Sequence, residues 1–248
     1  MKLFITDGTA EGFYTAVFVA YAEKEAVVTS QKNRQLSFDT EVINVIRDDE
    51  RAARVRVKLD KLDRYAAGDI DLALRSADAL KEQTAFEYIK LIVKNGRAVR
   101  RMLSVPTVIE MNDIISRVTG EVHKMKGFIR FMETRSGALY APYSPDNDIT
   151  DLLAPHFKAR LGEQKFAIHD VNRKIAALCD GNVWFMADVG NAEVYLSEYE
   201  KVFEDLWKKY YASVNIKERP HEKQMKGYMP VRYWKFLPEK NGLPDEND

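Results

Sequence analysis

The sequence predicts an α+β protein in which a mainly helical N-terminal region precedes an antiparallel sheet of about five strands with packed helices. Three observations lead to this prediction. Apolar residues recur at helical spacing before Gly127, whereas the pattern alternates with period two after it. Turn sequences such as Ser136-Gly137 separate the alternating stretches. Finally, 46% of the 248 residues are apolar and 31% are charged, a composition typical of globular domains.

The N-terminal region opens with a short strand, a turn and a helix. Lys2–Ile5 has the apolar pattern of a strand, and Asp7-Gly8-Thr9 combines a turn with a helix cap. A helix then follows over 11–23, with its apolar residues on one face. Two more strands and two helical stretches complete this region, at 27–29, 40–45, 48–65 and 70–93.

A long helix leads into the second region. Pro106 interrupts the preceding helical pattern, which then resumes over 107–126. Alternating residues on both sides of Ser136-Gly137 predict a β-hairpin. Because the strands follow one another like a meander, we expect an antiparallel sheet. The remaining elements are a helix at 147–161, strands at 165–170, 174–180 and 183–188, and a final amphipathic helix at 193–214.

These patterns divide the chain into two domains and a tail. Residues 1–100 form the predicted N-terminal, mainly helical α/β region, and residues 101–240 form the α+β domain. The polar residues 241–248 are expected to be disordered. No window approaches the length of apolar sequence that spans a membrane, and the first residues do not form a secretory signal. The sequence therefore predicts a cytoplasmic protein with no membrane partner.

The charge is segregated along the chain, although 38 basic and 38 acidic residues give a formal net charge of zero. Residues 208–240 contain nine Lys or Arg against three Glu, a net charge of +6, and six aromatic residues lie among them. Lys and Arg neutralise phosphates, while Tyr and Trp rings stack on unpaired bases. This segment therefore favours binding to a single strand or to a flipped-out nucleotide. The alternative is structural, with the aromatic rings in the core and the lysines on a solvated face.

Metal, cofactor and catalytic signals are weak. The single Cys179 has no partner for a disulfide or a zinc site, and we expect it to be a small buried residue. The histidines do not have the spacing of metal ligands, and no motif indicates a cofactor. Acid or base catalysis could use His123, His156 or His169, but the spacing does not favour one of them.

Several motifs resemble those of a known bacterial family. They are His123–Phe131, Ala154–Phe157 with Arg160, Trp207–Ser213 and Met229–Trp234. The family is a domain of unknown function that occurs fused to uracil-DNA glycosylases. It also occurs as a stand-alone protein of DNA metabolism encoded beside a radical-SAM protein of DNA repair. The opening residues Asp7–Phe13 resemble the start of the stand-alone form.

The resemblance implies a role in DNA metabolism or repair, and three hypotheses follow. The first is a protein that binds DNA through a basic and aromatic surface. The second is an enzyme that acts on a damaged base or nucleotide. The third is an adaptor for the radical-SAM protein. For the first hypothesis, the candidate contact residues are His123, Lys124, Lys126, Arg130, Lys208, Lys209, Tyr211, Arg219, Lys226, Arg232, Tyr233 and Trp234.

Overall fold

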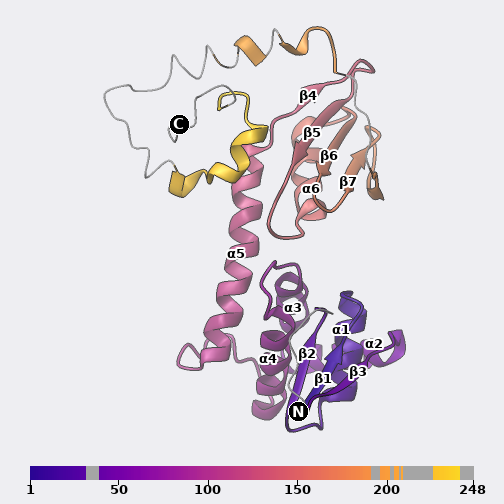
Figure 1. Cartoon of the computed structure of the whole chain (residues 1–248), viewed down its shortest axis with the longest axis vertical. Helices are drawn as coiled ribbons and strands as arrows, with labels where there is room; N and C mark the ends of the chain where they lie inside the picture. The colour runs from indigo at the N-terminus through magenta and orange to yellow at the C-terminus, as the bar shows by residue number, and fades with distance from the viewer. Residues whose placement is uncertain (32–38, 191–195, 202–203, 207, 209–225, 241–248) are drawn as a thin grey trace. The chain divides into compact units, whose positions relative to one another are not determined.

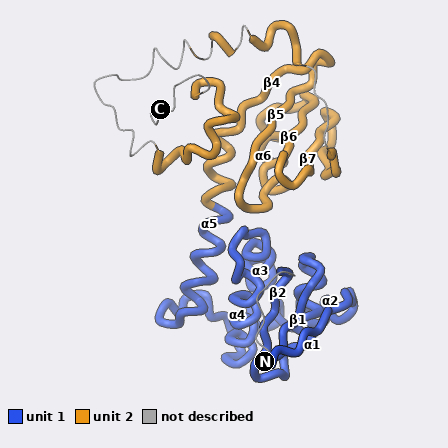
Figure 2. The backbone as a smooth tube through the Cα atoms, viewed as in Figure 1, with its two compact units in different colours: residues 1–119 blue, residues 120–248 orange. Residues whose placement is uncertain are grey.

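The computed structural model describes residues 1–31, 39–190, 196–201, 204–206, 208 and 226–240 (Figure 1). They form an α+β fold, as predicted, with two compact units. Unit 1 comprises residues 1–119 and unit 2 comprises residues 120–248 (Figure 2). The division between the units falls inside a single helix, α5 (Pro106–Phe128).

Unit 1 is built on a three-stranded parallel sheet, in the order β2-β1-β3. The central strand β1 (Lys2–Ile5) pairs with β2 (Ala26–Thr29) on one side and with β3 (Glu41–Asn44) on the other. Helix α1 (Ala10–Ala20) connects β1 to β2, because parallel neighbours need a crossover. The Thr9 side chain caps this helix by accepting a hydrogen bond from the Gly12 N–H at 3.0 Å.

Three further helices of unit 1 follow the sheet: α2 (Asp49–Leu62), α3 (Ala66–Leu74) and α4 (Lys81–Asn95). The helical pattern over 70–93 thus forms parts of two helices. Asp78 breaks it, because its carboxylate accepts a hydrogen bond from the Leu80 N–H at 2.8 Å and so favours a turn. Helix α4 ends at Gly96, whose φ of 63° is the left-handed conformation that glycine adopts without a steric penalty.

Unit 2 contains the five-stranded sheet, in the order β4-β5-β6-β7-β8. The chain supplies these strands in sequence order, as β4 (Met132–Glu133), β5 (Leu139–Tyr143), β6 (Phe166–Asp170), β7 (Ile175–Cys179) and β8 (Trp184–Asp188).

The sheet is mixed, so the expectation of a wholly antiparallel sheet was wrong for one pair. β5 and β6 run parallel, with Ala141 opposite Ile168, whereas the other neighbours are antiparallel. The reason is the intervening helix α6 (Thr150–Leu161), which carries the chain back to the start of the next strand. A meander of hairpins has no such crossover.

Helix α6 covers one face of this sheet. The ring of Phe166 on β6 lies 6.1 Å from the ring of Phe131, which in turn lies 5.1 Å from the ring of Phe157 on α6. Since side chains alternate along a strand, Ile168 shares the α6 face with Phe166, and His169 points to the opposite face. Cys179 is buried, as expected.

The described C-terminal residues form a short 3-10 helix, η1 (Val231–Phe236), which packs near β5. Of the predicted helix over 193–214, the described residues 200, 201, 204–206 and 208 are helical, whereas 196–199 are not, and Leu196 forms an antiparallel bridge with Thr134. The other residues of this helix lie outside the described residues, as does the expected disordered tail 241–248. Within the part of the chain that the structure describes, no helix has both the length and the apolar character needed to cross a membrane.

Candidate nucleic-acid interface

Three of the predicted contact residues lie on the last turns of α5. His123 is exposed to solvent, and Lys124 and Lys126 are half-buried. The carbonyl groups at the end of a helix carry partial negative charge, which stabilises cations at this place. The lysines at the end of α5 therefore stabilise the helix. They also place positive charge at the surface of unit 2.

Helix α6 brings a second pair of basic groups to the same neighbourhood. Burial lowers the pKa of His156, and the positive charges of Lys126 and Arg160 lower that pKa further. Lys126 therefore lies close enough to the imidazole to influence its charge, although 30 residues separate them in the sequence. His156 and Arg160 are four residues apart, the spacing that puts two side chains on one face of a helix. We call Lys126, His156 and Arg160 the α5/α6 basic cluster.

The structure pairs some of the predicted contact residues with carboxylates but not those of the α5/α6 basic cluster. Lys124, Lys126 and Arg160 have no carboxylate within 4.0 Å among the described residues. By contrast, the guanidinium of Arg130 lies 2.7 Å from a carboxylate oxygen of Glu239, whose side chain is only 1% exposed. Lys208 lies 2.6 Å from Glu204. Lys124, Lys126 and Arg160 are therefore not neutralised by a described carboxylate and can pair with an external anion.

The described C-terminal segment is tied to the protein instead. The Tyr233 hydroxyl donates a hydrogen bond to the Glu121 carboxylate, and the side chain is 3% exposed. Burial and Glu121 raise the pKa of Tyr233. Trp234 is half-buried and donates its Nε1–H to the Met229 carbonyl at 3.0 Å. Tyr233 therefore has no free ring face for a base. For this residue, the alternative interpretation of the segment, with the aromatic ring in the core, fits better.

Two other residues of the predicted surface, Arg232 and Lys226, are exposed, but Arg232 is also paired with a carboxylate. The Arg232 side chain is 49% exposed, and its Nη2 lies 2.7 Å from a carboxylate oxygen of Asp146. Lys226 is exposed, and two residues further along the chain the Tyr228 side chain is 69% exposed. Lys209, Tyr211 and Arg219 lie outside the described residues. The described residues 208 and 226–240 thus contribute a partly neutralised surface rather than a continuous row of accessible cations and rings.

A buried carboxylate organises this part of unit 2. Glu121 on α5 accepts hydrogen bonds from the Asp146 and Asn147 backbone N–H groups at 2.9 and 2.8 Å, and from the Asn147 side chain at 2.7 Å. With the Tyr233 hydroxyl it has four donors, enough to compensate the cost of burying its charge. The network connects α5, the loop before α6 and η1.

The three candidate catalytic histidines do not share a site. His169 is buried on the face of the sheet opposite α6, where its Nδ1 lies 2.8 Å from the Tyr140 hydroxyl. The sheet therefore lies between His169 and the helix that carries His156. No group of three or more His, Cys, Asp or Glu suited to a metal occurs among the described residues. The described geometry brings together no acid, base and nucleophile for a defined reaction.

Sequence reasoning did not select Arg160 or Glu121 as site residues. A signal for Arg160 was available, since it follows His156 at the helical spacing of four residues. Glu121 had no local signal. It is a single acid in an amphipathic helix, and its partner Tyr233 lies 112 residues further along the chain.

Comparison with known proteins gives a family match. A model of the family described as a domain of unknown function, DUF4130, matches residues 79–239. The expectation of a domain of unknown function is thereby confirmed for most of the chain. None of the curated proteins compared with the sequence matches it.

Proposed function

We infer that this chain, which belongs to the DUF4130 family of domains of unknown function, binds nucleic acid through the α5/α6 basic cluster. One observation carries the proposal. Lys126, His156 and Arg160 come from two elements, the charges of Lys126 and Arg160 lower the pKa of His156, and none of the three has a carboxylate partner among the described residues. Unneutralised cations such as Lys126 and Arg160 attract phosphate oxygens, which dominate the affinity of most nucleic-acid complexes.

The proposed surface has a centre and a periphery. His123 and Lys124 extend the α5/α6 basic cluster along α5, while Lys226, Arg232 and the exposed ring of Tyr228 belong to the described C-terminal segment. A single strand or a flipped-out nucleotide is the proposed ligand, because bases that are not paired in a duplex can stack on exposed aromatic side chains. Lys209, Tyr211 and Arg219 remain proposed contacts on sequence grounds.

The biological setting of the proposal is DNA metabolism or repair in a bacterial cytoplasm. The sequence motifs from His123 to Phe131 and from Met229 to Trp234 support it by resemblance. A radical-SAM protein is the proposed partner on the same ground.

Salt-dependent binding tests the proposal. Lys124, Lys126 and Arg160 are permanent cations, so log affinity for a single strand falls against log salt with a slope of roughly −2, at about −0.7 per phosphate. Replacing Lys126 or Arg160 by Gln weakens binding at low salt and reduces the magnitude of the slope by about 0.7. The measurement is fluorescence anisotropy of a labelled oligonucleotide, single-stranded or duplex, at several salt concentrations.

Two controls locate the surface. Lys165→Gln removes an exposed cation just before β6, outside the proposed surface, and leaves binding unchanged. Lys226→Gln and Lys235→Gln test the described C-terminal segment separately. If these two variants change the slope and Lys126→Gln and Arg160→Gln do not, the C-terminal segment binds the phosphates instead. Absence of binding by the unmodified protein at low salt contradicts the proposal and favours the adaptor hypothesis.

A further inference from the structure

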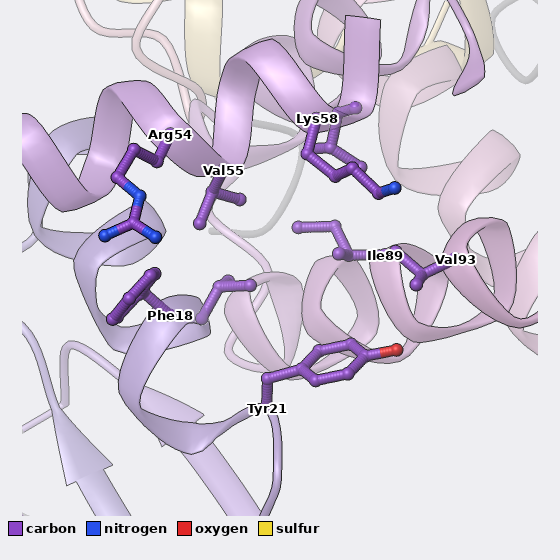
Figure 3. A pocket seen from close by; sticks show the side chains of 9 residues that line it. Phe18, Tyr21, Arg54, Val55, Lys58, Ile89 and Val93 are labelled. Carbon is purple, nitrogen blue, oxygen red and sulfur yellow. The ribbon is translucent and has the colours of Figure 1, made fainter. Parts of the chain in front are cut away.

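Unit 1 contains an apolar groove that the proposed function does not use (Figure 3). Its volume is about 370 Å³, and helices α1, α2 and α4 line it. Ile89 at its base is 1% exposed, whereas Phe18 and Tyr21 at its rim are 37% and 44% exposed. Large aromatic side chains are thus left accessible beside a hollow, the arrangement common in sites for small apolar ligands.

Two cations lie on the opposite side of this groove from the aromatic rings. Arg54 and Lys58 are one helical turn apart on α2, and Figure 3 shows Arg54 directed toward Phe18. The guanidinium carbon of Arg54 lies 5.1 Å from the centre of the Phe18 ring. None of the residues that line the groove is acidic.

The α2 cations that face the groove differ from Arg51 and Arg56 on the same helix in their pairing. Arg51 lies 3.1 Å from Asp48, and Arg56 lies 2.6 Å from Asp71. Arg54 and Lys58 have no carboxylate within 4.0 Å among the described residues. The two cations of α2 that face the groove are therefore left unneutralised by the described carboxylates, as is Lys61 outside it, whereas Arg51 and Arg56 are paired. Arginine and lysine stems also cover apolar surface where no ligand binds, so probes that differ only in charge are needed to separate recognition of a carboxylate from such covering.

We propose that this groove binds a small amphiphilic carboxylate, with its alkyl or aryl body on the apolar base and its carboxylate at Arg54 and Lys58. Apolar walls exclude a ligand with polar groups along its length, because each would lose its hydrogen bonds to water. The two cations favour a negative group at one end, with Arg54 able to donate two hydrogen bonds to a carboxylate. The size of the hollow fits a free small molecule, within the range of about 300–1,000 Å³ for such sites.

Calorimetric titration of the full chain tests the proposal. The probes are decanoate, decyltrimethylammonium and acetate, each below the concentration at which it forms micelles. Decanoate and decyltrimethylammonium share the alkyl chain and differ in charge, while acetate has the carboxylate alone. We expect one decanoate per chain, much weaker binding of decyltrimethylammonium and no detectable binding of acetate.

Variants assign the binding to the groove. Arg54→Gln combined with Lys58→Gln weakens decanoate binding about three- to tenfold, the effect of two partly exposed ion pairs. Both side chains are exposed, so this variant keeps the fold. Lys61→Gln, on the same helix but outside the groove, leaves binding unchanged. Val93→Trp fills the groove and abolishes decanoate binding, provided that circular dichroism shows a folded protein.

Three results would overturn the proposal. The first is the absence of decanoate binding. The second is equal binding of decanoate by the unmodified protein and by the double Gln variant. The third is failure of decanoate together with binding of an acidic amphipathic peptide that requires Arg54 and Lys58, which would make the groove a docking site for a protein helix.

Discussion

At the scale of single residues, His156 and His169 of unit 2 illustrate opposite uses of one side chain. His156 lies beside two cations at a half-buried position, whereas His169 is buried in the sheet with Tyr140 as its hydrogen-bond partner. Both have a lowered pKa, in each case chiefly because burial disfavours the charged imidazole. The consequences of the lowered pKa differ, because an anion bound at the surface can raise the pKa of His156 again.

We predict that nucleic-acid binding strengthens as the pH falls from about 7.5 to 6. Lys126 and Arg160 help to keep His156 neutral in the free protein, but a bound phosphate stabilises the imidazolium and raises its pKa. Binding therefore takes up a proton, and lower pH favours the complex. Anisotropy titrations at both pH values check this for the unmodified protein and for His156→Gln, which should lose the dependence. His123→Gln is the control for the second imidazole on this surface, and an unchanged pH dependence in His156→Gln argues against the assignment.

We also predict that His169 destabilises unit 2 in mild acid. Its folded pKa lies below the unfolded value of about 6.5, so the unfolded state binds the proton more readily. The free energy of unfolding therefore falls as the pH drops below about 6.5, by at most about 1.4 kcal/mol per pH unit. Urea denaturation between pH 5 and 7.5 measures this slope, which should decrease in His169→Gln. The exposed His123→Gln serves for comparison, and equal slopes in all three proteins would falsify the prediction.

At the scale of elements, Glu121 explains how η1 is held in unit 2. Its carboxylate gathers donors from the Asp146–Asn147 loop and from Tyr233, so three separate segments depend on one buried charge. Arg130 makes a second connection through Glu239, just after η1. Removing one donor from such a network costs more than an average hydrogen bond, because the charge stays buried with fewer partners.

Replacing Tyr233 by Phe should lower the free energy of unfolding by about 1 to 2 kcal/mol, since one charge-assisted hydrogen bond is lost while the ring stays in place. Urea denaturation monitored by circular dichroism measures the difference. Tyr228→Phe is the matched control, because its hydroxyl belongs to a side chain that is 69% exposed. Equal stability of the two variants would show that the hydroxyl of Tyr233 contributes no net stability.

At the scale of the whole molecule, the family match and the compact units have different boundaries. The match begins at residue 79, just before α4, whereas unit 1 continues to Thr119. The buried side chains of α4, among them Phe86, Ile89 and Ile92, belong to the core of unit 1. Helix α4 contacts α2, α3 and β2, all of which precede residue 79.

A chain shortened to residues 79–248 should therefore associate. Without its earlier partners the apolar face of α4 is exposed, and exposed apolar surface of this extent promotes aggregation. Size-exclusion chromatography with light scattering compares the fragment with the full chain. A monodisperse, monomeric fragment would show that the matched region is independent of the first 78 residues.

The sequence by itself determined the class and position of most described elements, because periodicity and turn residues act locally. The strand at Lys2–Ile5, the long helix after Pro106 and the three strands between 165 and 188 follow from such patterns. Only the tertiary structure decided how they pair. The parallel contact of β5 with β6 depends on the path of the chain through α6, and alternation of residues is the same in both kinds of pairing.

For the candidate site too, the sequence predicted some features and only the tertiary structure decided others. Composition alone indicated basic residues in two segments, but it could not show which cations are neutralised inside the protein. Arg130 and Lys126 look equivalent in the sequence, yet one is paired with a carboxylate 109 residues away and the other lies beside His156. Tyr233 likewise resembled an accessible stacking ring until Glu121 gave its hydroxyl a buried partner. Ion pairing and burial depend on residues distant in the chain, and only the folded structure brings them together.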